Sequence, residues 1–319
     1  MRAASHSQTI CGLLLLTLLA HTHPLTAQTA TEPPPTYTFT VPVDEVILTF
    51  HATGPQGLPA NDLKLNDLSL LDNGAPPHKI LEFRLLQDFP IHAGILIDTS
   101  ESMSTHLPGD RAIAIRFAQS LLRQQTDQAY LMDFGRLSRI QQPWTGNSPE
   151  LVASLRRIST GTESHTAGTA IFDTIYRTCL NQFGKIDPVT SGNVILLFSD
   201  GEDNASSMLL KDAVDMCQRT NTAIYAFRAQ QKPGSSSTGP QTLTDLTSQT
   251  GGRVFPDDAS EADLQKALQI IESSLRNQYR LVYRPTALKH DGSFHGIHLE
   301  TPKRFDSITV RSGYYAPTH

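Results

Sequence analysis

The sequence predicts an α/β fold: a doubly wound, mostly parallel sheet with helices on both faces, flanked by β-sandwich-like segments from both ends of the chain. From residue 91 onward, short apolar runs alternate with amphipathic helical patterns, as in parallel strands that helices cover on both faces. The segments before and after this region show strand-like alternation instead. In addition, two of the apolar runs end directly in an aspartate, Asp98 and Asp200. Ligands of open parallel sheets bind beyond such strand ends.

The amino terminus of this 319-residue chain has the layout of a secretory signal peptide. Arg2 is followed by an uncharged apolar run, Gly12–Ala20, and by small residues that permit cleavage after Ala27 or Ala30. The run is shorter than the ~20 residues of a bilayer-spanning helix, although an uncleaved anchor is the alternative. We therefore expect an exported protein that is periplasmic, surface-bound or secreted, with no transmembrane segment after cleavage.

The remaining chain divides into four parts. Residues 28–35 (QTATEPPP) form a polar, proline-rich linker. Residues 36–88 are β-rich, residues 89–277 form the α/β domain, and residues 278–319 form a carboxyl-terminal β segment. Because short strands are not stable alone, this last segment is expected to pack with residues 36–88.

The α/β region reads as a regular alternation of elements. Apolar or alternating runs predict strands, and periodic apolar positions predict helices. In chain order, we expect strand 91–98, helix 110–124, strand 129–134, strand-like piece 138–145, helices 148–158 and 169–183, strand 193–200, helix 207–220, strand 222–229, loop 230–241, a helix around 243–249, a short piece at 251–255 and helix 261–276.

Charge and cysteine content restrict the possible partners and the compartment. The formal net charge is −5, and no basic stripe is present, so nucleic-acid binding, which depends mainly on Lys and Arg, is not expected. Export permits a disulfide between Cys179 and Cys217, both in predicted helices. The sequence leaves open whether they pair or remain two separate buried thiols.

The stretch ILIDTSESMS carries the main chemical signal. Asp98, Ser100 and Ser102 follow a buried strand at alternate positions, and Asp200 closes another apolar strand on the same predicted rim. Two carboxylates at close range repel each other, and a hard divalent cation with oxygen ligands removes that cost. The pattern predicts a site for Mg²⁺, with Mn²⁺ or Ca²⁺ as alternatives.

These residues resemble the von Willebrand factor type A domain and its metal-ion-dependent adhesion site. DTSES matches the D-x-S-x-S motif of that family. The resemblance places the family's threonine on Thr169, in AGTAIFDTI, and its later aspartate on Asp200, in LLFSDGEDN. Over nearly the whole mature chain, the strands, motifs and the ending YRLVYRP…GYYAP look like the von Willebrand factor A-related family described from Acidobacteria.

Two positions depart from the family pattern without removing a ligand. Glu101 stands where many relatives have Gly, and Ala167 replaces the first Gly of G-G-T, whereas Gly168 keeps the second. We expect Glu101 to be solvated. Thr166 is a less favoured alternative ligand to Thr169.

The resemblance implies an exported protein-binding module for adhesion or assembly, in which an acidic side chain of a partner protein completes the coordination of the metal. The alternatives are a metal-dependent hydrolase and a structural envelope protein with a vestigial site. The sequence has neither a G-x-S-x-G elbow nor an H-E-x-x-H motif, so we do not expect an enzyme. The tail histidines His290, His295 and His298 are expected to be solvated turn residues.

Overall fold

The computed structural model describes residues 44–54, 59–123, 125–160, 168–187, 191–229, 238–301, 305 and 307–318. The predicted signal peptide, the linker, residues 36–43 and Thr166 lie outside these ranges. All described residues belong to one compact unit, Pro42–His319. Among the described helices, none has both the length and the apolar character of a bilayer-spanning segment.

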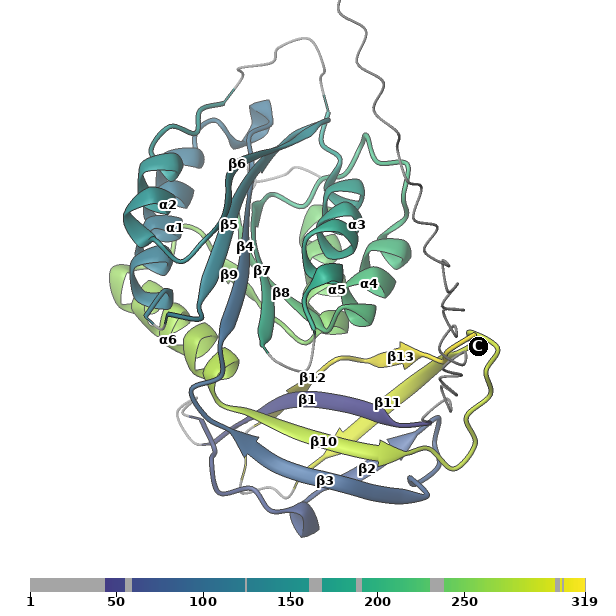
Figure 1. The fold of residues 1–319 in the computed structure, drawn as a ribbon. Coiled ribbons are helices and arrows are strands. Elements are labelled where there is room, and N and C mark those ends of the chain that lie inside the picture. Colours follow the sequence, from purple (N-terminus) through teal and green to yellow (C-terminus); the bar gives the residue numbers. More distant parts are fainter. Residues whose placement is uncertain are drawn as a thin grey trace, which may run out of the picture. The chain divides into compact units, whose positions relative to one another are not determined.

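A six-stranded sheet forms the centre of the α/β part, in the order β6-β5-β4-β7-β8-β9 (Figure 1). All neighbouring pairs are parallel except β5 and β6, which are antiparallel. The strands are β4 (Ile91–Asp98), β5 (Gln128–Phe134), β6 (Ser138–Thr145), β7 (Gly192–Ser199), β8 (Thr222–Arg228) and β9 (Val254–Pro256).

Helices cover both faces of this sheet, as Figure 1 shows. The α-helices of the described residues are α1 (Leu107–Leu121), α2 (Ser148–Leu155), α3 (Ile171–Asn181), α4 (Leu210–Arg219), α5 (Gly239–Thr250) and α6 (Glu261–Arg276). Apolar side chains of α1, α2 and α6 form one buried core with the sheet, and those of α3, α4 and α5 form another. Because alternate residues of a strand point to opposite faces, Ile95 joins the first core and Leu96 the second. This is why the central strands are apolar at nearly every position.

The winding direction of the sheet reverses at β4. The next strand in the chain, β5, lies on one side of β4, and β7 lies on the other. The carboxyl ends of β4 and β7 are therefore neighbours, with Ile97 opposite Phe198. In doubly wound sheets this is the place where a ligand crevice forms.

The two ends of the described chain build two antiparallel sheets. One has the order β12-β1-β10-β3 and the other β13-β11-β2. The strands are β1 (Val46–Thr53), β2 (Ser69–Asp72), β3 (Lys79–Leu86), β10 (Gln278–Arg284), β11 (Phe294–Glu300), β12 (Ser307–Val310) and β13 (Gly313–Tyr315). Strand β1 lies between two strands from the carboxyl-terminal segment, β10 and β12. A shared apolar core contains side chains from both chain ends. The predicted fold class is confirmed.

Several element boundaries differ from the prediction. The helix expected at 110–124 begins at Leu107, and the one expected around 243–249 begins at Gly239. Both have a proline in the first turn, where its missing N–H costs no hydrogen bond. Strand β11 begins at Phe294 and contains His295 and His298, which were predicted to lie in turns.

A buried ion pair fastens the base of the α/β part. The guanidinium of Arg276, at the end of α6, contacts both carboxylate oxygens of Asp127 and also donates to the carbonyl of Leu121 at 2.6 Å. Asp127 accepts the backbone N–H of Ile91, the first residue of β4. The start of β4 and the end of α6 are therefore tied to one carboxylate, close to where the chain passes between the α/β and β parts.

Candidate functional site

Two aspartates meet at the switch point of the sheet. Asp98 is the last residue of β4, and Asp200 directly follows the last residue of β7. Asp98 is fully buried. Burial raises its pKa to about 6, and the nearby Asp200 carboxylate acts in the same direction. The structure therefore brings together the two predicted carboxylates, and the Asp200 carboxylate makes the charge of Asp98 less favourable.

A tight turn after β4 places the two serines side by side. The backbone N–H of Ser100 donates to Asp98 Oδ1 at 2.9 Å, and the 3-10 turn Glu101–Met103 follows. The hydroxyl oxygens of Ser100 and Ser102 are 3.2 Å apart. The buried side chain of Met103 anchors this turn in the protein interior. Glu101 is exposed on the same turn, as expected.

Thr169 lies just before α3 and is held by the loop that follows β7. Its N–H donates to Asn204 Oδ1 at 2.8 Å, and its carbonyl accepts the N–H groups of Asn204 and Ala205. Gly168 has φ +118°, and a Cβ there would lie 2.9 Å from Asn204 Oδ1. This contact explains why glycine is needed directly before Thr169. The replacement of the other glycine of the G-G-T pattern by Ala167 does not affect it.

The acidic loop SDGEDN divides its side chains between structure and site. Asp200 Oδ1 accepts the N–H of Glu202, and Glu202 Oε1 accepts the N–H of Gly239 at the start of α5. Asp203 accepts the N–H of Phe172 in α3 and the hydroxyl of Ser206. Of the three acids, only Asp200 stands beside Asp98, so the negative charges of this loop are not interchangeable.

Gly201 makes the close approach of this loop to α5 possible. It has φ +84°, and a Cβ on this residue would lie 2.3 Å from the carbonyl oxygen of Gly239. Any residue with a side chain at this position would therefore push the Asp200 loop away from α5.

Sequence reasoning missed two polar residues that support the predicted ligands. Ser199 donates its hydroxyl to Asp98 Oδ2 at 2.7 Å, and Asn204 holds Thr169. Ser199 occupies the position before Asp200 in an otherwise apolar strand. A polar residue at the end of a buried strand next to β4 could have indicated that Ser199 contacts Asp98.

Two further aspartates, Asp257 and Asp110, lie near the start of α1. His106 Nδ1 and Asp257 Oδ2 are 2.6 Å apart, which joins the start of α1 to the loop after β9. Asp110 is fully buried in α1, and neither of its carboxylate oxygens has a hydrogen-bond partner within the described residues. Burial raises the pKa of Asp110 to about 8, and the Asp257 and Asp98 carboxylates add to the effect.

The donor set at the switch point fits a hard divalent cation. Two carboxylates and the hydroxyls of Ser100, Ser102 and Thr169 are all oxygen donors, which Mg²⁺, Mn²⁺ and Ca²⁺ prefer. A cation would also offset the cost of the buried Asp98 charge. Across the described ranges, no group of three or more His, Cys, Asp or Glu residues is arranged to hold a metal. A cation at the switch point would therefore depend on the serine and threonine hydroxyls as well as on the two carboxylates.

A disulfide joins the two helices that border this site. Cys179 in α3 and Cys217 in α4 are bonded, with their Cα atoms 5.2 Å apart. This resolves the alternative that the sequence left open. Thr169 precedes α3 and the Asp200 loop leads into α4, so the bridge limits the relative movement of two segments that supply ligands.

Of the three tail histidines expected to be solvated turn residues, His295 contradicts the expectation, His298 is exposed but lies in strand β11, and His290 lies in a bend and is half-buried. His295 is buried in β11, and its Nδ1 lies 2.7 Å from Asp72 Oδ1. The hydroxyls of Tyr283 and Tyr314 donate to the other oxygen of Asp72. His290 and His298 each pair with a separate carboxylate. Asp72 and the two tyrosines beside His295 come from the strands β2, β10 and β13, which the local sequence could not show, whereas Glu300 lies in the same strand as His298.

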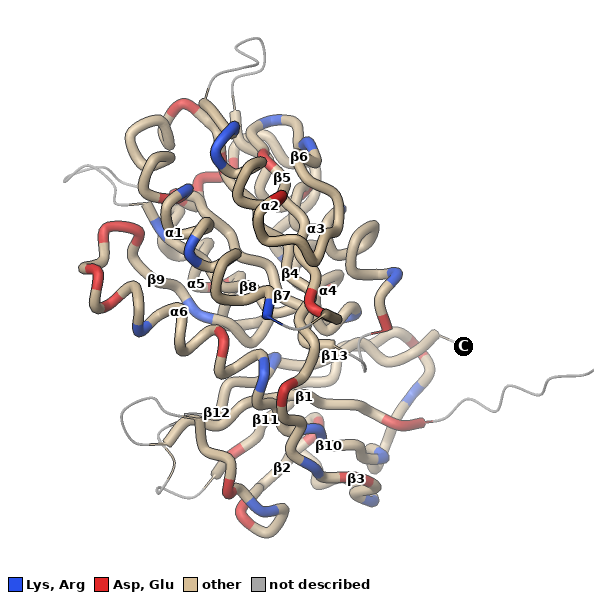
Figure 2. The backbone as a smooth tube through the Cα atoms, turned by 60° about the vertical axis from the view of Figure 1, so that its left-hand side comes forward, with Lys and Arg blue, Asp and Glu red and all other residues tan. Residues whose placement is uncertain are grey.

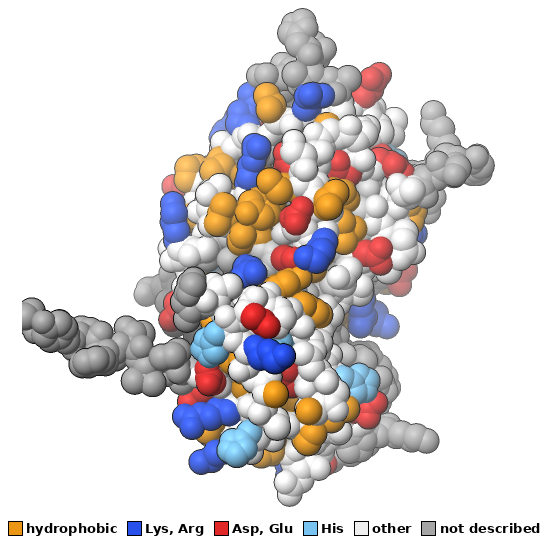
Figure 3. Space-filling view, turned by 90° about the vertical axis from the view of Figure 1, so that its right-hand side faces the viewer, with side chains coloured by type: hydrophobic (Ala, Val, Ile, Leu, Met, Phe, Trp, Pro, Cys, Tyr) orange, Lys and Arg blue, Asp and Glu red, His pale blue; other side chains and the backbone are white. Residues whose placement is uncertain are grey.

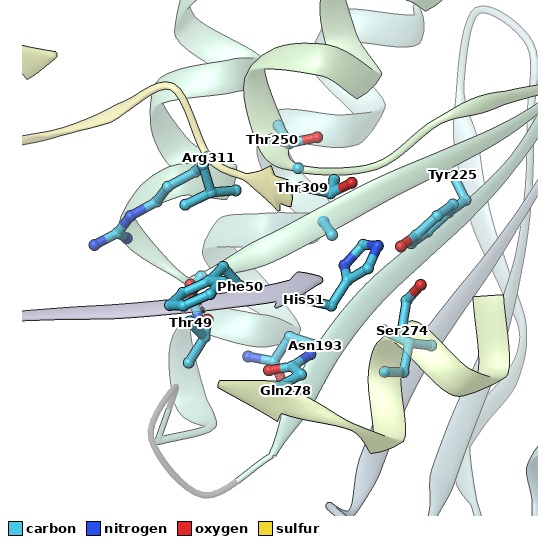
Figure 4. Close-up of a pocket in the computed structure, with 15 residues that line it drawn as sticks. Thr49, Phe50, His51, Asn193, Tyr225, Thr250, Ser274, Gln278, Thr309 and Arg311 are labelled. Carbon is cyan, nitrogen blue, oxygen red and sulfur yellow. Dashed lines mark hydrogen bonds between the residues drawn. The ribbon is translucent and has the colours of Figure 1, made fainter. Parts of the chain in front are cut away.

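A small polar cavity of about 40 Å³ lies between β1, β8, β10 and α6 (Figure 4). His51, Tyr225 and Ser274 are among the residues that line it. Burial, with a smaller contribution from Arg253, lowers the pKa of His51 to about 4, so this histidine is neutral at pH 7. The volume suits ordered water rather than an organic ligand.

The fold and the site define a class of protein: a doubly wound α/β domain with an oxygen-rich rim at its switch point. The sequence profile of the von Willebrand factor type A domain matches residues 94–269, and the chain belongs to this family. No curated protein matches the chain.

Solved structures with a similar arrangement include BatB from Bacteroides thetaiotaomicron, which is 16% identical with a TM-score of 0.46, covering 57% of this chain and 97% of that one. Proximal thread matrix protein 1 from the mussel byssus, described with a zinc-occupied MIDAS motif, is 12% identical with a TM-score of 0.47. That match covers 63% of this chain and 50% of the mussel protein. These likenesses concern the fold only.

Proposed function

We propose that this chain is an exported protein-binding module, for adhesion or assembly, whose contact with its partner depends on a divalent metal at the carboxyl end of the central sheet. The observation that carries the proposal is the buried Asp98 carboxylate beside Asp200, with the Ser100 and Ser102 hydroxyls 3.2 Å apart next to it. Such a site needs a cation to be stable in its charged form.

In this proposal each residue has a specific role. Asp98 and Asp200 supply charge, and the hydroxyls of Ser100, Ser102 and Thr169 supply neutral oxygen donors. Because only two donors are charged, a bound Mg²⁺ would keep affinity for one more anionic ligand. An Asp or Glu side chain of a partner protein is the natural candidate.

The contacts of His106 argue against a serine nucleophile at this site. A Ser–His pair would be needed to activate a serine as a nucleophile. Ser100 and Ser102 instead contact each other, and His106 contacts Asp257. In the described part of the chain no hydrogen bond joins His106 to either serine.

The Cys179–Cys217 disulfide supports the exported location. Disulfides form and persist in oxidising compartments and are rare in the reducing cytosol. Over the described residues no basic stripe is seen, which fits a protein partner better than a nucleic acid. Along the described backbone, Lys and Arg are interspersed with Asp and Glu (Figure 2).

The test is metal binding followed by partner capture. By calorimetry we expect the purified protein to bind Mg²⁺ or Mn²⁺, Asp98→Ala and Asp200→Ala to lose binding, and Ser100→Ala to weaken it less, because a hydroxyl carries no net charge. Equal binding by wild type and Asp98→Ala would overturn the site.

Partners should then be captured from the envelope fraction of the source cell in Mg²⁺ or Mn²⁺ and released by EDTA. We expect Thr169→Ala to lose the partner even where some metal binding remains. Capture at full strength in EDTA would place the interface elsewhere.

A further inference from the structure

Three large apolar side chains are exposed on loops around the candidate metal site. Leu137 is 65% exposed, Leu209 68% and Met208 37%. We call these three residues the apolar rim. Figure 3 shows hydrophobic side chains gathered over the α/β part of the face that carries α3 and α4, with charged residues between them. Isolated exposed leucines are normal on protein surfaces, so the position of these three is what matters.

Hydrogen bonds tie the apolar rim to the segment that carries Thr169. The N–H of Ala170 donates to the carbonyl of Gly135 at 2.9 Å, and Gly135 closes a turn with Leu137. On the other side, the N–H of Met208 donates to Asp173 Oδ1 at 2.8 Å, in the first turn of α3. The segments that carry the rim are therefore bonded to the residue after Thr169 and to the first turn of α3.

Local structure does not explain Leu209. It is the N-cap residue of α4, a position that favours Ser, Thr, Asp or Asn because their side chains accept a free N–H of the first turn. Leucine cannot do so, and here its side chain also faces solvent. Met208, one residue earlier, is partly covered. The backbone N–H of Leu209 donates to Asp212 Oδ2 at 2.9 Å, but the Leu209 side chain gains neither burial nor a hydrogen bond. A contact with another molecule would give this residue a role.

The charges nearby restrict what that molecule can be. Asp98 and Asp200 lie at the site, and Glu101 is exposed beside it. Two basic residues lie next to the rim: exposed Arg136 precedes Leu137, and Lys211, two residues after Leu209, pairs with Asp215. Acidic residues of a partner that approached Asp98, Asp200 or Glu101 without reaching the metal would be repelled there. One carboxylate on the cation, with apolar neighbours on the rim, avoids this repulsion.

We propose that the partner is a protein segment in which a single Asp or Glu is flanked by large apolar side chains, the acid reaching the metal and the apolar residues packing on Leu137, Met208 and Leu209. This inference rests on the proposed metal-dependent binding function. It adds a specificity surface that the metal ligands alone do not provide.

The test uses random peptides displayed on phage and selected on the purified full chain in Mg²⁺, with elution by EDTA. We expect the eluted peptides to contain an Asp or Glu close to large apolar residues. Leu209→Asn is the main variant, because Asn is a preferred N-cap residue and should keep or improve the stability of α4. It should bind the synthesised peptides about tenfold more weakly, the effect of losing one significant interface contact.

Leu180→Asn is the matched control, since Leu180 is also an exposed leucine of the same face, near the far end of α3. It should bind the peptides as the wild type does. If EDTA elutes no specific peptides, the metal-dependent function fails. If the eluted peptides carry an acid without apolar enrichment, or bind Leu209→Asn as tightly as wild type, the metal function stands and the apolar rim is refuted.

Discussion

Replacing Asp110 by Asn should change the pH dependence of stability. The Asp110 carboxyl is fully buried without a hydrogen-bond partner in the described residues, and its pKa rises from 3.8 to about 8 in the folded protein. Between these values the folded state keeps a proton that the unfolded chain releases. Stability therefore falls as pH rises from about 4 towards 8, because the folded state binds more protons than the unfolded state.

The size of this effect follows from the shift. Each pKa unit corresponds to about 1.4 kcal/mol, so the roughly three units between 3.8 and pH 7 set an upper limit of about 4 kcal/mol. Water entry and local relaxation reduce the cost of a buried charge, and we expect about half of this limit. Asn has nearly the same shape and does not titrate, so Asp110→Asn should gain about 2 kcal/mol relative to wild type between pH 4 and pH 7.

Urea unfolding of both proteins at several pH values, in EDTA so that no metal contributes, measures this difference. The informative quantity is the slope with pH, because a constant offset from the amide itself cancels. A stability difference that stays the same from about pH 4 to 7 would show that Asp110 is ionised in the folded protein, and the reasoning would be refuted.

Three further perturbations test the architecture. Asp127→Ala leaves the buried Arg276 guanidinium with the longer 3.6 Å contact to Glu272 in place of its hydrogen-bonded carboxylate and should cost about 3–5 kcal/mol in urea unfolding. A cost below about 1 kcal/mol would mean that water or Glu272 replaces Asp127. Cys179→Ser with Cys217→Ser removes a bridge across 38 residues and should cost about 4 kcal/mol by the chain-entropy estimate; unchanged unfolding would show that the bridge does not limit the unfolded chain. Truncation after Arg276 removes both strands that pair with β1 and should cause aggregation, which light scattering measures, while a soluble monomer would contradict this. Residues 89–277 alone should fold as an α/β domain by circular dichroism, since they contain the whole six-stranded sheet.

The sequence by itself determined the fold class and the order of the main elements. Apolar runs such as Val194–Phe198 report burial on both faces of a strand, and burial follows directly from hydrophobicity. The placement of Asp98 and Asp200 on one rim also followed from the sequence, because all parallel strands of a sheet end on the same side. Boundaries were less certain, since prolines in the first turn of α1 and α5 allow these helices to start earlier than their apolar periodicity indicates.

Only the tertiary structure decided which side chains meet. That Ser199 holds Asp98, that Asn204 holds Thr169 and that His295 is buried against Asp72 all depend on segments far apart in the chain. The pairing of Cys179 with Cys217 likewise depends on the packing of α3 against α4. Local patterns report the burial and conformation of a segment, whereas contacts between distant segments follow from the order of strands in the sheet, which no single stretch of sequence contains.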